Sequence, residues 1–582
     1  MRIKHFFGLA VIAAMTASCS SNNDLVNGGN GSGENETGAS YASFSINLPT
    51  RSGTRATDLT FDKGNAKEYD VFNATLLVFK EGTTAGEGNY TLAEKVDLGS
   101  MEPWKDPSET GVTTQAKITA KLEKVDKNGN FFALVLLNNG STSADAKVNL
   151  PAEGTTFSAW NKADNANYTN FTDTKKGFYM ANAPLYNSTN KSVTTLVPIK
   201  KENIFSTEAQ ASSGEAAADI YVERGLAKVT LTAATKDKKT VDASSSYTGD
   251  EVTINNWALD VTNKKTFPIH NVDGLTTEYA DIWNNAATTT GPSNKRFVDN
   301  NTETKVKRVY WGTDPNYKET NLSEATEESK TARTENFNYV KKGDLTADPK
   351  DPQYCLENTF NLANMVQGQT TRVVFKGTYT PKSITPDENG TFYKIGKNVA
   401  LWNSADLEKH IAAAVTKVVA DASAAGASTT ITLKGSDNDL TTAGNHMLKA
   451  SNITVTKATG DVVTLQPEDV TAINDKLGLS EGYGISTYEK GESYYIARIK
   501  HFGDALTPWD SGAYGNDNLA YLGRYGMLRN NWYELDVEKV SGPGYPDVPD
   551  VKPSTPDDED DQYIKVSVKI LDWAKRSQSV DL

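Results

Sequence analysis

The stretch YASFSINLPTRSGTRATDL, residues 41–59, joins a regular strand pattern to a loop-like sequence. The apolar residues alternate with small polar ones, at Phe44, Ile46 and Leu48. This period of two predicts a β-strand with one apolar face. Arg51 and Arg55 follow in a Ser/Thr/Gly-rich stretch, which is typical of a loop whose backbone a protease can reach. We therefore expect a first strand that one cleavage would detach from the rest of the chain.

A second regular strand lies at the other end of the chain, in YIKVSVKILDWAKRSQSVDL, residues 563–582. Its aliphatic residues again occupy every second position, at Ile564, Val566, Val568 and Ile570. An isolated strand of this kind needs partners for both its backbone and its aliphatic face. It could fold back onto its own domain, or it could add to the sheet of another subunit.

The segment before this tail, SGPGYPDVPDVKPSTPDDEDDQ at residues 541–562, contains five prolines and a run of acids. This composition predicts an extended, self-repelling spacer. At roughly 3.1 Å per residue the spacer would reach about 70 Å, more than a strand returning to its own domain needs. We therefore predict that the tail is a donor strand for another molecule, where it fills the groove that the detached Phe44 strand leaves.

The first 19 residues have the pattern of a secretory signal peptide. Basic residues precede an apolar run that is too short to span a membrane, and small residues precede Cys19. Small residues directly before a cysteine resemble a bacterial lipobox, in which Cys19 would be lipidated and become the new N-terminus. A plain secretory signal is the alternative. A lipid on the Gly/Asn/Ser-rich tether that follows would anchor an exported protein to the outer membrane.

The composition favours a mostly β protein of several domains. The 582 residues are 37% hydrophobic and carry a net charge of -14, so the basic surface that binds nucleic acid is not expected. Short strands between turn-rich spacers predict two tandem β-sandwiches of transthyretin-like or Greek-key type. Helical periodicity around Leu407 and after Pro467 predicts a small helical insertion in the second sandwich. The predicted order is signal peptide (1–19), tether with the removable strand (20–55), N-terminal sandwich (56–220), C-terminal sandwich (221–540) with its insertion at about 399–478, linker (541–562) and donor segment (563–582).

The residues that could carry chemistry are scattered along the chain. The two cysteines, Cys19 and Cys355, cannot build a disulfide framework. The four histidines beyond the signal peptide lack the close pairing of a metal-binding helix; they are His270, His410, His446 and His501. The stretch GTFYKIGKN at 390–398 departs from a phosphate-binding loop in length and in its final residue. We predict no catalytic residue, no metal site and no cofactor.

Four segments together resemble one protein family. The most specific is YLGRYGMLRNNWYELDVEKVSGPGYP at 521–546, and the others are YVERGLAKV at 221–229, YWGTDPNY at 310–317 and YCLENT at 354–359. They are similar to segments of the Bacteroidales fimbrillins, the subunits of protease-assembled (type V) pili, and most closely to the minor-fimbria shaft subunit. The similarity extends over essentially the whole chain.

The resemblance implies a lipidated precursor that is exported through the periplasm to the cell surface and cut there by an Arg-specific protease. Arg55 is the favoured cleavage site and Arg51 the alternative. The tail of one copy would then enter its neighbour, which gives a homopolymer with tip and anchor subunits and surface receptors as further partners. The alternatives are a tip adhesin or anchor subunit of the same fimbria, or a glycan-binding surface lipoprotein. An enzyme has no motif in its favour.

Overall fold

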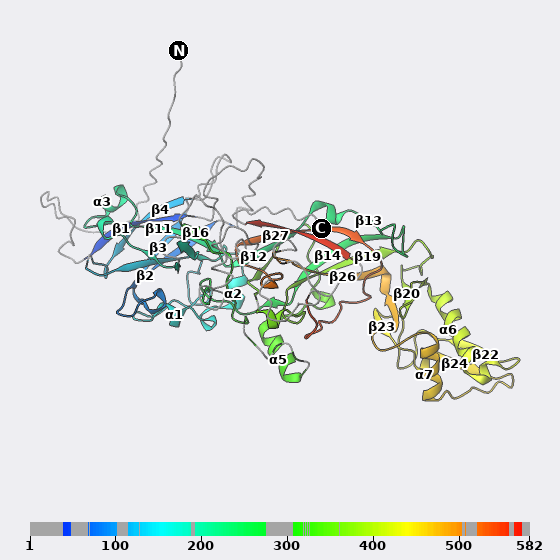
Figure 1. Cartoon of the computed structure of the whole chain (residues 1–582). Coiled ribbons are helices and arrows are strands. Elements are labelled where there is room, and N and C mark those ends of the chain that lie inside the picture. Colours follow the sequence, from blue (N-terminus) through cyan, green and yellow to red (C-terminus); the bar gives the residue numbers. More distant parts are fainter. Residues whose placement is uncertain are drawn as a thin grey trace, which may run out of the picture.

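The structure is a computed structural model of the chain in which two β domains and a smaller mixed unit follow one another (Figure 1). The N-terminal strands lie at one end, a second set of sheets lies in the middle, and the helices of the mixed unit lie at the other end. The structure describes residues 39–47, 68, 70–101, 115–126, 128–187, 192–274, 306–317, 319, 322, 324, 326–359, 361–502, 507, 521–557 and 564–572.

The N-terminal domain is built on a nine-stranded sheet. Its hydrogen-bonded path runs β10-β1-β11-β6-β5-β2-β3, with β4 beside β1 and β9 beside β5. Three short helices accompany it: α1 (Phe157–Trp160), α2 (Tyr168–Thr172) and α3 (Glu208–Ser213). The strands are β1 (Ser40–Asn47), β2 (Val71–Lys80), β3 (Thr91–Met101), β4 (Gln115–Leu122), β5 (Phe131–Leu137), β6 (Met180–Asn182), β9 (Val197–Pro198), β10 (Ile204–Phe205) and β11 (Ala218–Arg224).

The C-terminal domain, which lies in the middle of Figure 1, is a β-sandwich of two four-stranded sheets and is also called the C-terminal sandwich below. One sheet has the order β18-β12-β27-β28, and the other has the order β13-β14-β19-β26. Both contribute side chains to one core, which includes Val229, Trp257, Phe375 and Tyr533, each fully buried. The strands are β12 (Leu226–Leu231), β18 (Gln353–Leu356), β27 (Asn531–Val540), β28 (Ile564–Asp572), β13 (Lys239–Thr240), β14 (Glu251–Asp260), β19 (Arg372–Thr380) and β26 (Glu492–Arg498). The prediction of a mostly β chain with sandwich domains is confirmed.

The two domains follow the same strand plan. In the first, β1 pairs with β4 in antiparallel fashion on one edge and with the last strand, β11, in parallel on the other. In the second, β12 pairs with β18 in antiparallel fashion and with β27 in parallel. Gly225 alone separates β11 from β12, so the change of sheet falls a few residues beyond the boundary expected near residue 220.

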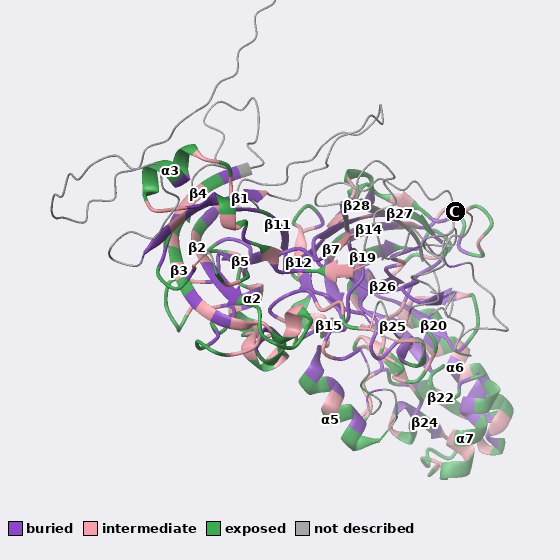
Figure 2. Cartoon of the chain, turned by 60° about the vertical axis from the view of Figure 1, so that its left-hand side comes forward, coloured by how far each residue is buried: buried purple, intermediate pink, exposed green. Residues whose placement is uncertain are grey.

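Two small sheets lie beside these larger ones. A three-stranded sheet has the order β16-β7-β8, and β15 pairs with β17 directly after helix α5. Figure 2 shows that exposed residues gather on α5 and on the helices of the mixed unit, whereas the sandwich strands are largely buried. The bounds are β7 (Leu185–Asn187), β8 (Ser192–Thr194), β16 (Val306–Arg308), β15 (Thr262–Asn263), β17 (Phe337–Asn338) and α5 (Glu327–Asn336).

The mixed unit, residues 392–488, lies between the paired strands β19 and β26 and has its own core. The predicted helices are present: the side chain of Asn403 caps α6, where Leu407 and Ile411 are fully buried, and Pro467 opens α7. Strands on both sides of the helices make the unit wider than the stretch 399–478. Its elements are β20 (Phe392–Ile395), β21 (Leu401–Trp402), α6 (Ser404–Val418), β22 (Ser428–Ile431), β23 (Gly444–His446), β24 (Ile453–Thr456), α7 (Pro467–Lys476) and β25 (Ile485–Tyr488).

Candidate functional site

The first strand is a central strand of the N-terminal domain. All eight residues of β1 pair with β4, and its second half also pairs with β11, where Phe44 lies opposite Ala218 and Ile46 opposite Ile220. The side chains of Phe44 and Ile46 are 0% exposed and belong to the domain core. Both edges and the apolar face of β1 are therefore covered, so its removal would open two strand edges and a strip of core.

The second face of β1 is also buried, because α3 lies over it. Ser43 and Ser45 point away from the core but are 0% and 4% exposed. The Ser43 hydroxyl donates to the carbonyl of Glu215, just after α3, at 3.5 Å. Of the residues predicted for the removable strand, Leu48 lies outside the described residues. Cys19, Arg51 and Arg55 lie outside them too.

The tail strand β28 folds back onto its own chain. It pairs with β27 in antiparallel fashion and is the outermost strand of its four-stranded sheet. The four predicted donor positions, in chain order, lie opposite Val540, Val537, Leu535 and Tyr533; they are Ile564, Val566, Val568 and Ile570. Since β28 has a neighbour on one edge only, it can leave without breaking any other strand pair in the described part of the chain.

The linker before the tail is not the free spacer that its composition predicts. Residues 541–557, here called the strap, run along the C-terminal sandwich. Tyr545 exchanges two backbone hydrogen bonds with Tyr494, at 2.9 and 2.8 Å. Tyr545 and Val548 pack against one apolar cluster of the sandwich, and Val551 packs against another. The expectation was wrong for the strap because a few apolar residues among the prolines and acids suffice to dock it.

The far end of the strap is held by polar contacts. The amide of Gln367 donates to the carbonyl of Thr555 at 2.9 Å, and the amide of Asp557 donates to that of Met365 at 3.2 Å. The Asp557 carboxylate accepts from the hydroxyl of Thr370 at 3.0 Å and is 0% exposed. An acidic residue that composition places in a solvated run is therefore a buried attachment point.

A buried ion pair joins the segment after the predicted cleavage sites to the C-terminal domain. The ammonium of Lys228 on β12 lies 2.8 Å from the carboxylate of Glu68, and both side chains are almost completely buried. The hydroxyl of Tyr354 donates to the same carboxylate at 2.7 Å. The Lys228 ammonium also lies 3.8 Å from the ring centre of Trp532. If cleavage occurred at Arg51 or Arg55, Glu68 would therefore remain attached to the C-terminal domain.

Asn530 connects the two domains directly. Its side-chain oxygen accepts from the amide of Arg224, the last residue of β11, at 3.0 Å. The backbone amide of Asn530 donates to the carbonyl of Leu226, the first residue of β12, at 2.8 Å. Its φ of 59° is left-handed, a conformation that asparagine tolerates better than most residues. No pattern in the sequence marks this role of Asn530 at the junction.

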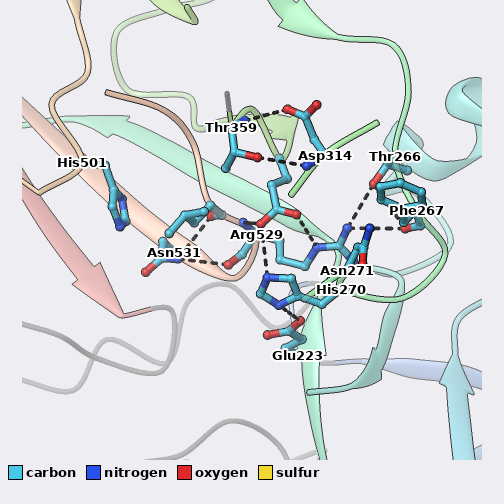
Figure 3. Close-up of polar contacts among 12 residues, drawn as sticks. Glu223, Thr266, Phe267, His270, Asn271, Asp314, Thr359, His501, Arg529 and Asn531 are labelled. Carbon is cyan, nitrogen blue, oxygen red and sulfur yellow. Dashed lines mark hydrogen bonds and ion pairs between the residues drawn. The ribbon is translucent and has the colours of Figure 1, made fainter. Parts of the chain in front are cut away.

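A cluster of buried charged side chains surrounds the same junction (Figure 3). His270 contacts Glu223 of β11 at 2.8 Å, and its second ring nitrogen lies 3.6 Å from Glu357. Arg529 pairs with Glu357 at 3.3 Å. These four side chains are at most 3% exposed, so their polar groups find their partners inside the protein. Burial next to this cluster raises the pKa of Asp314 to about 7.

The contacts described so far hold strands and domains together. In the part of the chain that the structure describes, no group of three or more His, Cys, Asp and Glu side chains could hold a metal ion. Cys355 is buried, and burial raises the pKa of its thiol to about 12. The ring of His410 packs against that of Trp402, with ring centres 4.5 Å apart and the planes tilted by 35°. Within the same described residues, no helix has the length and apolar character that crossing a membrane requires.

Comparison with protein families gives one match, to the description "Major fimbrial subunit protein type IV, Fimbrillin, C-terminal", over residues 486–579. The C-terminal part of the chain is thus similar to the C-terminal part of the fimbrillins. This confirms the resemblance seen in the sequence and supports a structural subunit of a cell-surface fimbria. The fimbrillin match extends from the end of β25 through β26, β27 and the strap to the tail. It therefore includes both the tail strand β28 and its pairing partner β27.

Other comparisons add little to the fimbrillin match. The search of curated proteins gave no match. The crystal structure of a proposed cell adhesion protein from Parabacteroides distasonis is 11% identical, covers 92% of this chain and 99% of its own, and has a TM-score of 0.31. The major pilin of Streptococcus pyogenes is 8% identical, covers 62% of this chain and 89% of its own, and has a TM-score of 0.13. Both TM-scores are too low for either structure to enter the argument.

Proposed function

We propose that the chain is a fimbrial shaft subunit that polymerises by strand exchange. An Arg-specific protease cuts after Arg55, or after Arg51, and frees the first strand. The tail strand of a neighbouring copy then takes the place of β1 between β4 and β11. The single observation that supports this best is the position of β1: it is the first described strand of the chain, yet it is a central and largely buried one.

The two strands suit each other in size and pattern. β1 has eight residues and β28 has nine, and apolar residues alternate with polar ones at Ala42, Phe44 and Ile46 in β1 and from Ile564 to Ile570 in β28. The replaced strand sits between two partners, whereas the incoming strand leaves a single partner behind. Exchange therefore increases the number of paired edges of the tail strand from one to two, which favours the polymer.

The remaining parts of the proposal concern the route to the surface. Cys19 carries the lipid of the precursor, and the precursor travels through the periplasm to the outer membrane. Cleavage removes the lipid together with the first strand, so the mature subunit is held by its neighbours alone. Tip and anchor subunits and surface receptors are its further partners.

The test is assembly in solution with a purified Arg-specific protease. The wild-type chain is expected to give a ladder of polymers on a gel without boiling, and filaments by electron microscopy. The double variant Arg51→Ala/Arg55→Ala should remain monomeric because β1 stays covalently attached. A chain ending at residue 563 should be cleaved but form no polymers. Filaments from either variant would contradict strand exchange.

The chain without its tail also provides a sharper readout. It keeps the groove, so it should accept the tail of a wild-type subunit, but it has no tail to insert into the next subunit. Mixed with wild-type chain before cleavage, it should shorten the polymers in proportion to its share of the mixture. Unchanged polymer length would show that the groove does not receive the tail.

One observation favours a tip adhesin as the second candidate. Seven large hydrophobic residues are exposed in the described part of the chain, and four of them belong to the mixed unit at the far end: Val399, Met447, Val462 and Tyr483. Exposed apolar residues that form one contiguous patch mark a binding surface, which a tip adhesin would need. Antibody labelling of fimbriae separates the roles, since a shaft subunit is labelled along the whole length and a tip subunit at one end.

A further inference from the structure

The strap raises the question of which part of the C-terminus moves when the tail is passed to a neighbour. We propose that the strap, residues 541–557, stays docked on its own subunit, and that only the chain beyond Asp557 is exchanged. The surface around Asp557 is then the contact surface for a second copy of this chain. This inference rests on the proposed strand exchange.

The contacts of the strap are spread along its whole length. Near its start the hydroxyls of Tyr488 and Tyr495 donate to the carbonyls of Gly544 and Gly542, at 2.9 and 3.1 Å. In its middle Arg372 donates to the carbonyl of Pro549 at 2.6 Å. At its end Asp557 holds Thr370, as described above. The strap is therefore fixed up to its last residue and has no slack to contribute to the reach of the tail.

Removing the strap would uncover groups that need it. The Arg372 guanidinium also pairs with Asp260 at 2.8 Å, and these two side chains are 2% and 1% exposed. The backbone of Gly368 approaches Pro553 so closely that a Cβ added at Gly368 would lie 2.7 Å from the Pro553 Cα. A glycine at a contact this close indicates a packed interface rather than a passing one. Peeling would expose a buried charge and an apolar strip and would form no bond in return.

A docked strap limits how far apart two subunits can be. Seven Cα–Cα steps lead from Asp557 to Ile564, which span at most about 25 Å in a fully extended chain. The first residue of a donor strand thus lies within about 25 Å of Asp557, far less than the whole linker would allow. The N-terminal domain of the neighbour then lies close to the surface formed by residues 365–370 and 553–557, which we take as the contact surface.

The charges at the two sides of this contact are complementary. Of the six residues between Asp557 and Ile564, four are acidic, Asp558 to Asp561. In the acceptor, β4 borders the groove and exposes Lys117 and Lys121. An acidic connection that enters beside these lysines meets opposite charge, which supports a second copy of this chain as the partner.

A disulfide across the strap tests the proposal. Val366 and Pro556 face each other in an antiparallel bridge. The hydrogen bonds from Gln367 to Thr555 and from Asp557 to Met365 flank this pair. The pair is therefore of the non-hydrogen-bonded kind, with Cα atoms about 4.5 Å apart, where a disulfide fits. The double variant Val366→Cys/Pro556→Cys is compared in oxidised and reduced form, with protease added to both.

We expect the oxidised form to polymerise as fast as the reduced form, within about twofold. An oxidised form that stays monomeric, and that assembles once a reductant is added, would overturn the docked strap. The same double variant ending at residue 563 is the matched control. Polymers from that control would refute strand exchange itself, so the two failures are distinguishable.

Hydrogen exchange on the wild-type chain gives a second test that needs no substitution. The backbone amides of Gln367 and Tyr494 donate to carbonyls of the strap, and the backbone amide of Tyr545 in the strap donates to the carbonyl of Tyr494. If the strap stays docked, these amides are equally protected in monomer and polymer. Loss of their protection in the polymer would show that the strap has left its body and would overturn the proposal.

Discussion

The ammonium of Lys228 lies 2.8 Å from the carboxylate of Glu68, and the two side chains are 4% and 1% exposed. Glu68 follows the predicted cleavage sites, whereas Lys228 belongs to the first strand of the C-terminal domain. The pair therefore attaches Glu68 to the C-terminal domain.

The substitution Glu68→Gln should lower the thermal unfolding midpoint by on the order of 10 °C. It leaves the Lys228 ammonium buried without its counter-charge, which costs about 3–5 kcal/mol. The control is Glu123→Gln, which breaks the exposed pair with Lys121 and should change the midpoint by about 2 °C or less. Calorimetry of the three chains compares them. Equal shifts would show that the buried pair contributes no more to stability than the exposed pair.

Two substitutions at Asn530 separate its backbone role from its side-chain role. Asn530→Gly keeps the left-handed conformation but leaves the buried amide of Arg224 without its acceptor, a loss of about 1–3 kcal/mol. Asn530→Ala loses the acceptor and adds backbone strain of about 1–2 kcal/mol. Melting midpoints should fall in the order wild type, glycine, alanine. An alanine variant as stable as the glycine variant would contradict the role of φ.

Asp314 predicts a pH effect. Burial raises its pKa to about 7 from an ordinary value of 3.8, so the folded protein binds this proton more tightly than the unfolded chain. The stability that the neutral carboxyl contributes is fully present below pH 3.8 and is lost as the pH rises to about 7. The midpoint of the wild type minus that of Asp314→Asn should therefore fall between pH 4 and pH 8. A difference that does not change with pH would refute the shift.

Phe44 should control how fast the cut strand leaves. Phe44→Ala removes a fully buried ring from the core of the N-terminal domain, at a cost of about 3–5 kcal/mol. After proteolysis, release of the fragment that carries β1 should be accelerated on the order of a hundredfold. Tyr41→Ala, in the same strand but outside the core cluster, is the control. Mass spectrometry of the fragment follows the release. Identical rates for both variants would show that Phe44 does not hold the strand.

The sequence predicts the elements whose own residues carry the signal. Alternation at Phe44 and Ile46 marks a strand, and the repeat at Leu407 and Ile411 marks a helix, because burial of one face requires these periods. The domain change at Gly225 is harder to place. Only Glu223, Arg224 and Gly225 separate the apolar residues of β11 from those of β12, and so short a break does not mark a domain boundary.

Contacts between distant residues were outside the reach of sequence patterns. Glu68 and Lys228 are 160 positions apart, and nothing local marks either of them as a partner. The prediction for the strap was wrong for the same reason. Proline lacks an amide donor but keeps its carbonyl. The carbonyl of Pro549 accepts from Arg372, which lies far away in the sequence. An average over the linker also hides Tyr545, Val548 and Val551, which dock it.

The single residue between β11 and β12 has a mechanical consequence. In the proposed filament, a pulling force acts on the neighbour's tail strand, which would pair with β11. The force passes from β11 through Gly225 into β12, and from β12 to β27 across their parallel strand pair. Because the force runs along the strands, the hydrogen bonds are sheared together instead of being opened one after another. A filament of such subunits would resist stretching by flow at a surface without needing any covalent cross-link.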